Sequence, residues 1–244
     1  MILKNKVIIV TGGSGLIGSE IIKDISAKGG IAINADISVA TNLENKTAYI
    51  DITSEKSVES IIEIIYKKFG RIDGLVNNAY PRTKDWGTSF EEMTYDSWRK
   101  NVDMQMNSVF LLIQKIAPLL MKSKGSVVNI TSIYGVVGND MSIYKNTKIN
   151  TVPAYTAIKG GIVNFTRYLA SYYGERGVRF NCVSPGGIFD NQDPVFVKNY
   201  ESRVPMARMG NPDDIAPSVS FLLSNESKYI TGQNLIVDGG WTAI

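Results

Sequence analysis

"KVIIVTGGSGLIG", residues 6–18, joins a run of apolar, mostly β-branched residues to glycines at positions 12, 15 and 18. A short apolar run, a glycine-rich turn and a segment of helical period predict a strand, a tight turn and a helix. Glycines in such a turn let the backbone approach a pyrophosphate, which lies at the positive end of the helix dipole. The stretch therefore indicates a dinucleotide site, and the alternative is a tight turn that holds no ligand.

Apolar strands and helical segments alternate along the rest of the chain. Strands are expected at residues 6–12, 31–36, 73–79, 125–132, 178–187 and 234–240. Helices are expected at residues 16–29, 54–70, 93–122, 152–177 and 211–224. Continuously apolar strands separated by helices predict an α/β Rossmann fold, a doubly wound parallel sheet with helices on both faces. Because no linker-like stretch interrupts the 244 residues, we expect residues 1–244 to form a single domain.

Composition narrows the classes of function. The formal net charge is +3 and the cations are dispersed along the sequence, so neither nucleic acid nor a membrane is an expected partner. The chain has no histidine, which excludes His-based triads, and we expect no metal site. Its one cysteine, Cys182, lies in an apolar stretch and is expected to be a buried structural thiol. With no room for a signal peptide before residue 6 and no uninterrupted apolar run of spanning length, a cytoplasmic protein is expected.

Asp36 indicates which dinucleotide binds. It ends the second expected strand, 24 residues after Gly12. A carboxylate there can accept hydrogen bonds from the hydroxyls of an adenine ribose, and it would repel a 2′-phosphate. The neighbouring residues offer no cation for such a phosphate. We therefore expect NAD rather than NADP.

Tyr155 and Lys159 are the candidate reactive pair. They lie four residues apart at the start of an expected helix, so both side chains share one face. The ammonium, helped by a positive nicotinamide, should favour the tyrosinate and lower the pKa of the phenol. Ser132 ends the preceding strand and could hold a substrate oxygen. Because most Tyr-x-x-x-Lys pairs line a solvated face, the inference of proton exchange coupled to hydride transfer depends on all these features together.

These motifs and several others resemble the short-chain dehydrogenase/reductase family, in that family's order and over essentially the whole chain. They are "TGGSGLIG" (11–18), "DIT" (51–53), "NNA" (77–79), "NITS" (129–132), "YTAIK" (155–159), "RFNCVSPGG" (179–187) and "VDGGW" (237–241). The resemblance implies Ser132, Tyr155 and Lys159 as catalytic residues. It implies cofactor contacts from Gly12, Ser14, Gly15, Leu16, Ile17, Gly18, Asp36, Asp51, Ile52, Asn78, Ala79, Tyr80, Tyr155, Lys159, Pro185, Gly186 and Ile188.

The chain departs from the family's compact branch at several positions. Leu16 stands where that branch has glycine, and 22 residues separate Ser132 from Tyr155. Both features are similar to the extended branch, which mostly modifies nucleotide sugars, although this chain is too short for that branch's substrate domain. The family's fourth catalytic residue, an asparagine, is Gln105 here, so Gln105 is the candidate for that role. The usual "NNAG" is "NNAY", which puts Tyr80 beside the nicotinamide region.

Two loops and a later segment are the candidates for substrate contacts. Residues 80–87 and 144–150 follow strand ends and carry cations that could meet a phosphate or carboxylate, or could simply be solvated. The candidate substrate contacts are Arg82, Lys84, Tyr134 and Lys145. Residues 190–212 correspond to the family's substrate lid, and Tyr200, Arg203 and Met206 within them are further candidates. Loop segments are similar to a bacterial subgroup associated with sugar synthesis for flagellin and surface glycans.

Three functions remain open from the sequence. The first is NAD-dependent interconversion of a secondary alcohol and a ketone, on a small-molecule sugar or sugar derivative. The second is an epimerase or dehydratase that retains its NAD, and the third is a non-catalytic NAD-binding sensor. The resemblance also implies a homotetramer or dimer, paired through the long helices that start near residues 93 and 153.

Overall fold

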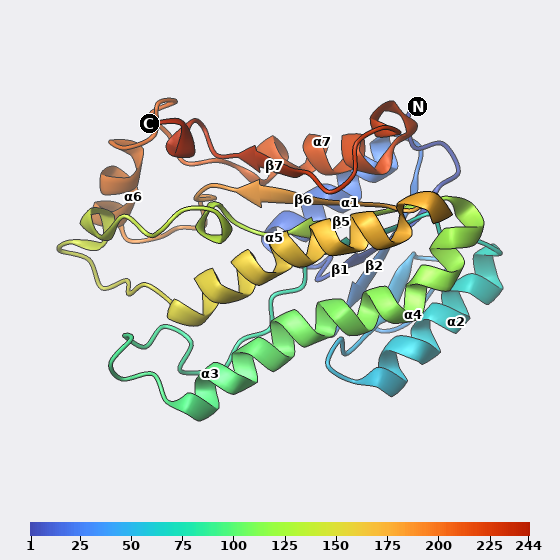
Figure 1. Ribbon diagram of the computed structural model, residues 1–244, viewed down its shortest axis with the longest axis horizontal. Coiled ribbons are helices and arrows are strands. Elements are labelled where there is room, and N and C mark those ends of the chain that lie inside the picture. Colours follow the sequence, from blue (N-terminus) through green and yellow to red (C-terminus); the bar gives the residue numbers. More distant parts are fainter.

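The computed structural model describes residues 1–244 and contains one seven-stranded sheet (Figure 1). The strands are β1 (Val7–Thr11), β2 (Ile31–Asp36), β3 (Thr47–Tyr49), β4 (Gly74–Asn77), β5 (Ser126–Ile130), β6 (Arg179–Pro185) and β7 (Asn234–Val237). Their order across the sheet is β3-β2-β1-β4-β5-β6-β7, and every neighbouring pair is parallel. The strand order reverses between β1 and β4, which is where open α/β sheets bind their ligands.

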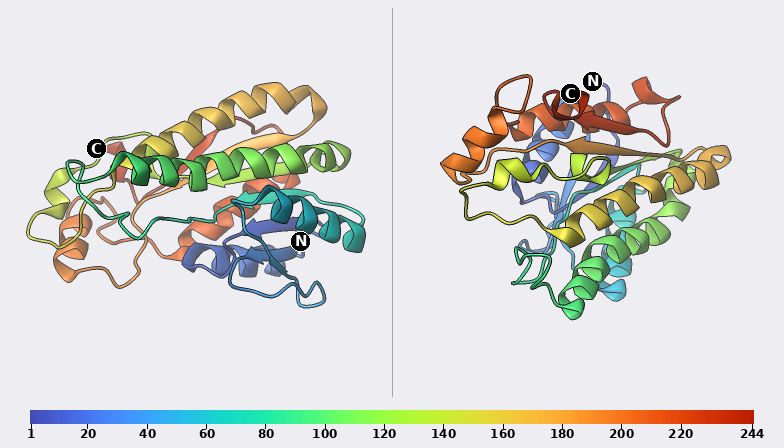
Figure 2. Two further views of the ribbon diagram at one scale, coloured as in Figure 1. Left: turned by 90° about the horizontal axis from the view of Figure 1, so that it is seen from below. Right: turned by 60° about the vertical axis from the view of Figure 1, so that its left-hand side comes forward.

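Helices cover both faces of this sheet, so the predicted doubly wound α/β fold is confirmed (Figure 2). They are α1 (Leu16–Ala27), α2 (Glu55–Phe69), α3 (Tyr95–Val102), α4 (Ser108–Ser123), α5 (Pro153–Tyr173), α6 (Pro194–Glu201) and α7 (Pro212–Leu223). One apolar cluster joins the sheet to α1 and α7, and a larger one joins it to α2, α4 and α5. Strand β1, which is buried along its whole length, consists almost entirely of apolar residues.

Local stereochemistry explains why α2 begins and ends where the sequence predicts. The hydroxyl of Ser54 caps the helix by accepting a hydrogen bond from the Ser57 backbone N–H at 3.3 Å. The helix ends at Gly70, which adopts φ 71°, a conformation that glycine tolerates without strain. Strand β3 and helix α6 were not predicted from the sequence, since three residues are too few to show an alternating pattern and α6 lies within the expected lid.

The long helix expected over 93–122 is interrupted by a π-helical turn, Asp103–Asn107, between α3 and α4. The Ser108 hydroxyl donates to the carbonyl oxygens of Met104 (2.7 Å) and Gln105 (3.2 Å) within this turn. Tyr95–Ser123 is long and apolar enough to cross a membrane, by length and composition only. This differs from the expectation that no apolar segment of the chain reaches spanning length. Within the protein, 44% of the most apolar window of this segment is buried. Most of its buried apolar side chains belong to the cluster shared with α2 and α5.

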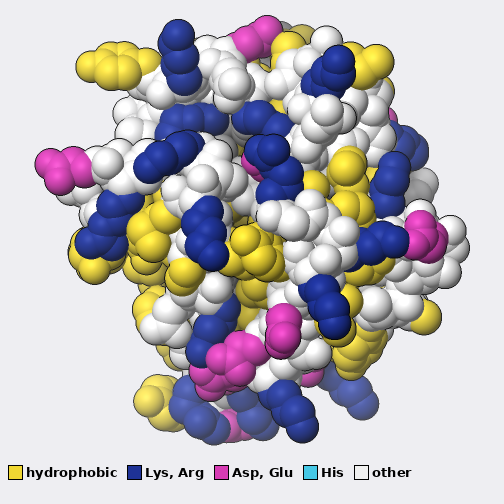
Figure 3. Space-filling view, turned by 90° about the vertical axis from the view of Figure 1, so that its right-hand side faces the viewer, with side chains coloured by type: hydrophobic (Ala, Val, Ile, Leu, Met, Phe, Trp, Pro, Cys, Tyr) yellow, Lys and Arg dark blue, Asp and Glu magenta, His cyan; other side chains and the backbone are white.

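Cations gather on the face of the molecule where strands begin and helices end (Figure 3). Lys67 and Lys68 end α2, Lys122 lies in the last turn of α4, and Arg176 follows α5. Cations are favoured there because the C-terminal end of a helix carries a partial negative charge. The fold therefore collects charges that are dispersed along the sequence, and it places them opposite the carboxyl ends of the strands.

Candidate active site

A cavity of about 730 Å³ runs along the carboxyl ends of the strands. Such volumes are typical of cofactor and substrate sites. The cavity is lined by most of the residues that the sequence singled out: Gly12, Gly15, Leu16, Ile17, Asp36, Asp51, Ile52, Asn78, Ala79, Tyr80, Arg82, Ser132, Tyr134, Tyr155, Lys159, Pro185, Gly186 and Ile188. The fold thus brings segments from the whole length of the chain to one site.

Seven of the residues singled out from the sequence do not line this cavity: Ser14, Gly18, Lys84, Gln105, Lys145, Arg203 and Met206. Ser14 and Gly18 support the glycine turn from outside the lining, and Gln105 is buried in the π-helical turn. Lys84 and Lys145 are exposed to solvent. Sequence reasoning did not single out several lining residues. Four of them lie in the quoted motifs, namely Thr53, Ile130, Thr131 and Gly187, and no motif gave a signal for Ala35, Ile37, Ile50, Pro81, Ile133, Gln192 and Phe196.

The glycine turn fits a pyrophosphate because side chains are excluded from it. Gly12 adopts φ +64°, and a Cβ at Gly18 would lie 2.2 Å from the Gly12 carbonyl oxygen. The Asn78 amide, at the end of β4, donates to the carbonyl oxygens of Thr11 (3.1 Å) and Gly12 (2.9 Å). These contacts hold the bare backbone of the turn at the start of α1, where the helix dipole favours an anion.

Gly18→Ala is expected to weaken NAD binding at least tenfold and to lower the free energy of unfolding by about 1–3 kcal/mol. The added methyl group would displace the Gly12 carbonyl and with it the turn. Isothermal titration calorimetry and chemical denaturation measure the two effects. Gly174→Ala is the matched control, because a Cβ there meets nothing within 4 Å. Equal NAD affinity in both variants would contradict this role of the turn.

Asp36 lies at the adenosine end expected for the cofactor. Its carboxylate accepts hydrogen bonds from the Ser14 N–H (3.1 Å), the Ser38 N–H (2.9 Å) and the Ser38 hydroxyl (2.8 Å). Burial alone would raise the pKa of Asp36, but the hydrogen bonds from Ser38 and Ser14 outweigh burial and lower it below its usual value. The group is therefore an anion at neutral pH, suited to ribose hydroxyls and unfavourable to a 2′-phosphate.

Ser132, Tyr155 and Lys159 converge at the other end of the cavity. Tyr155 and Lys159 occupy the first two turns of α5, and Ser132 follows β5. The Lys159 Nζ donates to the Ile130 carbonyl oxygen at 2.9 Å and lies 5.5 Å from the centroid of the Tyr155 ring. The Ser132 hydroxyl and the Tyr155 phenol both line the cavity here, and the hydroxyl acts to lower the pKa of the phenol. This arrangement can hold a substrate oxygen between a hydroxyl and a phenol.

Burial dominates the acid–base properties of this pair. It raises the pKa of the Tyr155 phenol above its usual value, and the nearby Ser132 hydroxyl only partly offsets the rise. For the protein by itself the pKa of Tyr155 is therefore raised and not lowered, because burial is the largest influence on it. That the ammonium and a positive nicotinamide together lower it stays a prediction. Burial also lowers the pKa of Lys159, from its ordinary 10.5 to about 8. At neutral pH the phenol is protonated and most of the lysine is charged.

Gln105 is buried, with 4% of its surface exposed, on the π-helical turn. Neither its amide nitrogen nor its amide oxygen has a hydrogen-bond partner. Buried amides are normally paired with protein or water, so this side chain marks a polar position inside an otherwise apolar layer. Its role as the replacement for the family's asparagine remains a prediction.

The expected lid packs against the long segment between β5 and α5. From α6, the Asn199 amide donates to the carbonyl oxygens of Ile143 (3.1 Å) and Lys145 (3.2 Å). Arg203 forms an ion pair with Asp140 at 2.8 Å. A third apolar cluster lies beneath these contacts and consists of Ile133, Ile143, Phe196, Tyr200, Val204, Met209 and Trp241. The substrate end of the cavity is thus enclosed by two segments that are distant in sequence.

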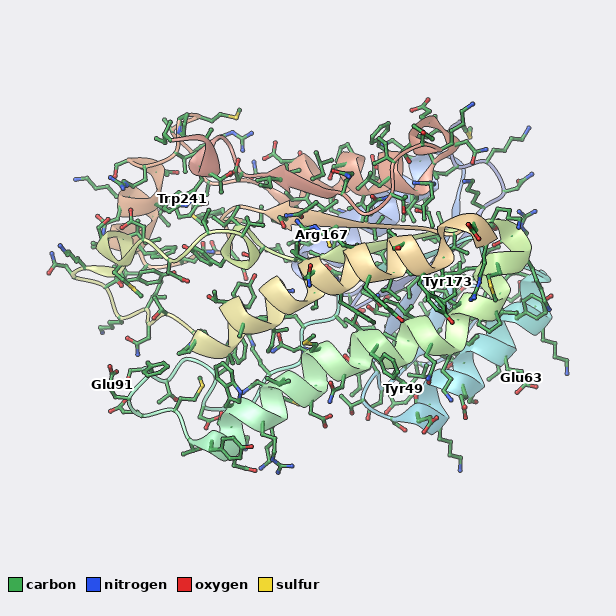
Figure 4. All side chains as sticks on the ribbon, in the orientation of Figure 1. Tyr49, Glu63, Glu91, Arg167, Tyr173 and Trp241 are labelled. Carbon is green, nitrogen blue, oxygen red and sulfur yellow. The ribbon has the colours of Figure 1, made fainter.

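Aromatic side chains form much of this enclosure. Tyr200 stacks on Trp241 with ring centroids 4.5 Å apart, beside α6 (Figure 4). The Tyr144 hydroxyl donates to the Tyr134 oxygen at 3.4 Å, and the Tyr144 ring contacts Phe196 with centroids 5.5 Å apart. Burial raises the pKa of Tyr134 and of Tyr200, so both phenols stay neutral near physiological pH. The substrate end therefore offers neutral hydroxyls and ring faces, a lining that suits a polyhydroxylated molecule.

Arg82 and Lys159 are the two cations of the cavity lining. Arg82 is exposed at the rim and forms no ion pair. A free guanidinium at the rim is available to an anionic group of a substrate. Of the loop cations singled out from the sequence for this task, the structure places only Arg82 at the cavity.

The fold and this arrangement of residues define a Rossmann-fold oxidoreductase that uses a nicotinamide cofactor. A family model described as "Enoyl-(Acyl carrier protein) reductase" matches residues 31–242. The chain belongs to the short-chain dehydrogenase/reductase family.

Relatives match this chain over nearly its full length. Post-translational flagellin modification protein A of Campylobacter coli is 36% identical, with 98% of this chain and 99% of the relative covered. The 7alpha-hydroxysteroid dehydrogenase of Bacteroides fragilis is 30% identical, with 98% and 95% covered. The structure of a short chain dehydrogenase from Leptospira borgpetersenii with bound NAD+ is 38% identical and has a TM-score of 0.88, with 98% and 94% of the two chains covered.

Proposed function

We propose that this protein is an NAD-dependent oxidoreductase that interconverts a secondary alcohol and a ketone on a sugar derivative used in surface-glycan synthesis. The observation that carries the proposal is the single cavity lined by the glycine turn, Asp36, Ser132, Tyr155 and Lys159. The flagellin-modification relative supports the choice of substrate. The protein acts in the cytoplasm as a single domain, with residues 190–212 as its lid.

The chain's own residues divide the chemistry between them. The glycine turn and Asp36 hold the two ends of the adenosine diphosphate part of NAD, and NAD, when bound, accepts or supplies the hydride. Ser132 holds the substrate oxygen, and the Tyr155 Oη takes or gives the proton of that oxygen. Lys159 keeps a positive charge beside the phenol, which favours the tyrosinate during alcohol oxidation. The lid and the tyrosines exclude water from the reacting carbon.

A panel of candidate substrates tests the proposal. NADH absorbance would be followed with sugars, sugar phosphates and nucleotide sugars, each with NAD and with NADP. Turnover with NAD on an anionic sugar is expected, because Arg82 lies free at the rim. Cofactor that copurifies with the protein and no net NADH release would indicate an epimerase or dehydratase. Tight NAD binding without turnover on any substrate would indicate a sensor.

Asp36→Ala is expected to raise the KM for NAD by about 10- to 100-fold, because a hydrogen bond to a charged group contributes about 1.5–3 kcal/mol. The KM for NADP should fall, since the variant no longer repels a 2′-phosphate. Steady-state kinetics with both cofactors measure the change in preference. Glu63→Ala, on α2 and remote from the cavity, is the control and should keep the original preference (Figure 4). An unchanged ratio in Asp36→Ala would refute this basis for NAD preference.

We also infer that the protein forms a homodimer or homotetramer through α4 and α5. A row of aromatic side chains lies on these helices, with Phe110, Tyr168 and Tyr172 exposed by 51%, 58% and 49%. Phe165 stacks on Tyr168, and Tyr168 stacks on Tyr172, with centroids 6.1 and 5.8 Å apart. Such an ordered apolar surface is typical of an interface.

Tyr168→Glu is expected to shift the protein towards smaller species, because a carboxylate would be buried without a partner at the centre of this surface. Light scattering coupled to gel filtration measures the mass, and NAD binding reports that each subunit remains folded. Lys198→Gln, on α6, lowers the net charge by the same one unit away from the row and serves as the control. An unchanged mass in Tyr168→Glu would place the interface elsewhere.

A further inference from the structure

Tyr80 belongs to a cluster of three aromatic rings that includes Tyr155. The ring centroids of Tyr80 and Trp86 are 5.6 Å apart, those of Tyr80 and Tyr155 are 5.6 Å apart, and those of Trp86 and Tyr155 are 6.3 Å apart. All three pairs meet nearly at right angles, at 79–83°, which is a preferred arrangement for aromatic rings. Trp86 is buried, whereas Tyr80 also lines the cavity. The cluster therefore reaches from the interior to the proposed reaction centre.

The Tyr80 ring also faces cations. The Lys159 Nζ lies over it, 5.5 Å from the ring centroid, and the Arg82 guanidinium lies at the same distance. The attraction between a cation and a ring face is larger where water is excluded, and Lys159 is buried. Trp86 packs against the Tyr80 ring at nearly a right angle, with centroids 5.6 Å apart, and this contact holds the ring in place.

We propose that Tyr80 is a positioning residue: its ring stabilises the Lys159 ammonium and seats the ring of Tyr155. The catalytic consequence depends on the proposed function, since Tyr155 and Lys159 are the proton-exchanging pair only there. The contact with the ammonium does not depend on that function, because it exists in the folded protein by itself.

The other groups around Lys159 do not stabilise its ammonium with a negative charge. On α5, Tyr155 is neutral because burial raises the pKa of its phenol. On β6, Cys182 is also neutral where Lys159 titrates, because burial raises the pKa of the thiol to about 11. From β5, the Ile130 carbonyl accepts one hydrogen bond. No full negative charge thus faces the ammonium, and the ring faces of Tyr80 and Tyr155 supply the remaining electron density.

Two substitutions at Tyr80 distinguish the effect of its aromatic ring from that of its hydroxyl. Tyr80→Leu removes the ring and is expected to lower the pKa of Lys159 by about one unit from its value near 8. Tyr80→Phe keeps the ring and should leave that pKa within about 0.3 units of the original. Protein labelled with carbon-13 at the lysine ε-carbon reports the titration by NMR, and the spectrum of Lys159→Met assigns the resonance. The alkaline limb of kcat/KM should move by the same amount in active protein.

The outcomes distinguish this proposal from the proposed function. An unchanged Lys159 titration in Tyr80→Leu overturns the positioning role, as does an equal shift in Tyr80→Phe, which would assign the effect to the hydroxyl. If Tyr80→Leu does not fold, Tyr80→Trp is used instead, and it should raise the Lys159 pKa because indole binds cations best. An unchanged or lower pKa in Tyr80→Trp would overturn the proposal. The expected NMR shift in a protein without turnover would support the positioning role and reject only the proposed function.

Discussion

Tyr155→Phe is expected to lower kcat by about 10²- to 10⁴-fold, the usual contribution of one proton-transfer group. The substitution removes only the phenol oxygen and keeps the ring that contacts Tyr80 and Trp86. The affinity for NAD should therefore change little. NADH absorbance with the substrate found in the panel measures kcat, and calorimetry measures NAD binding.

Tyr168→Phe is the matched control for this prediction, because Tyr168 lies on the same helix with its side chain exposed. It should retain the original kcat. Full turnover in Tyr155→Phe would refute the proposed mechanism, since the Tyr155 phenol is the group proposed to exchange the proton. A loss of NAD binding equal to the loss of kcat would instead assign Tyr155 to cofactor binding.

Lys159→Met is expected to abolish turnover and yet to stabilise the protein at pH 7. Burial lowers the pKa of Lys159 from 10.5 to about 8, so the folded state holds the ammonium less readily than the unfolded chain does. A difference of about 2.5 units corresponds to about 3 kcal/mol lost below pH 8. The Met side chain avoids this cost but leaves the Ile130 carbonyl without its partner, which costs about 1–3 kcal/mol. The net gain at pH 7 is about 1 kcal/mol.

The difference in stability between Lys159→Met and the wild type should change with pH in a defined direction. Between pH 8 and pH 10.5 the unfolded chain still binds the proton that the folded protein has released, so the stability of the wild type rises with pH there. The advantage of Lys159→Met should therefore shrink by about 3 kcal/mol over that interval and become a disadvantage. Chemical denaturation at several pH values measures the difference. A difference between Lys159→Met and the wild type that does not vary with pH would refute the prediction.

Features encoded within a few residues were predictable. The strand, glycine turn and helix at residues 6–18 follow from apolar period and from the need for bare backbone at Gly12 and Gly18. Ser54 and Gly70 mark the ends of α2 because capping is local. The assignment to the short-chain dehydrogenase/reductase family is also confirmed, and it was possible because each of the motifs is a short stretch of sequence.

Features that depend on distant contacts were not predictable. Helix α6 and the enclosure of the substrate end of the cavity depend on packing between residues about 50 positions apart. No local sequence pattern indicates which of these residues will be in contact. Lys84 and Lys145 resemble Arg82 in sequence, but only Arg82 reaches the cavity. The π-helical turn that buries Gln105 lies within an otherwise regular helical pattern.

The sequence by itself determined the α/β class, the family, the glycine turn and the identities of Ser132, Tyr155 and Lys159 as candidates. Only the tertiary structure decided the acid–base state of that site. Spacing along a helix reveals that an ammonium lies near a phenol, but a pKa depends on the water excluded by every segment around both groups. For Tyr155 the exclusion of water raises the pKa of the phenol, and for Lys159 it lowers the pKa of the ammonium. The aromatic rings that face the ammonium include that of Tyr80, which lies 79 residues away in the sequence.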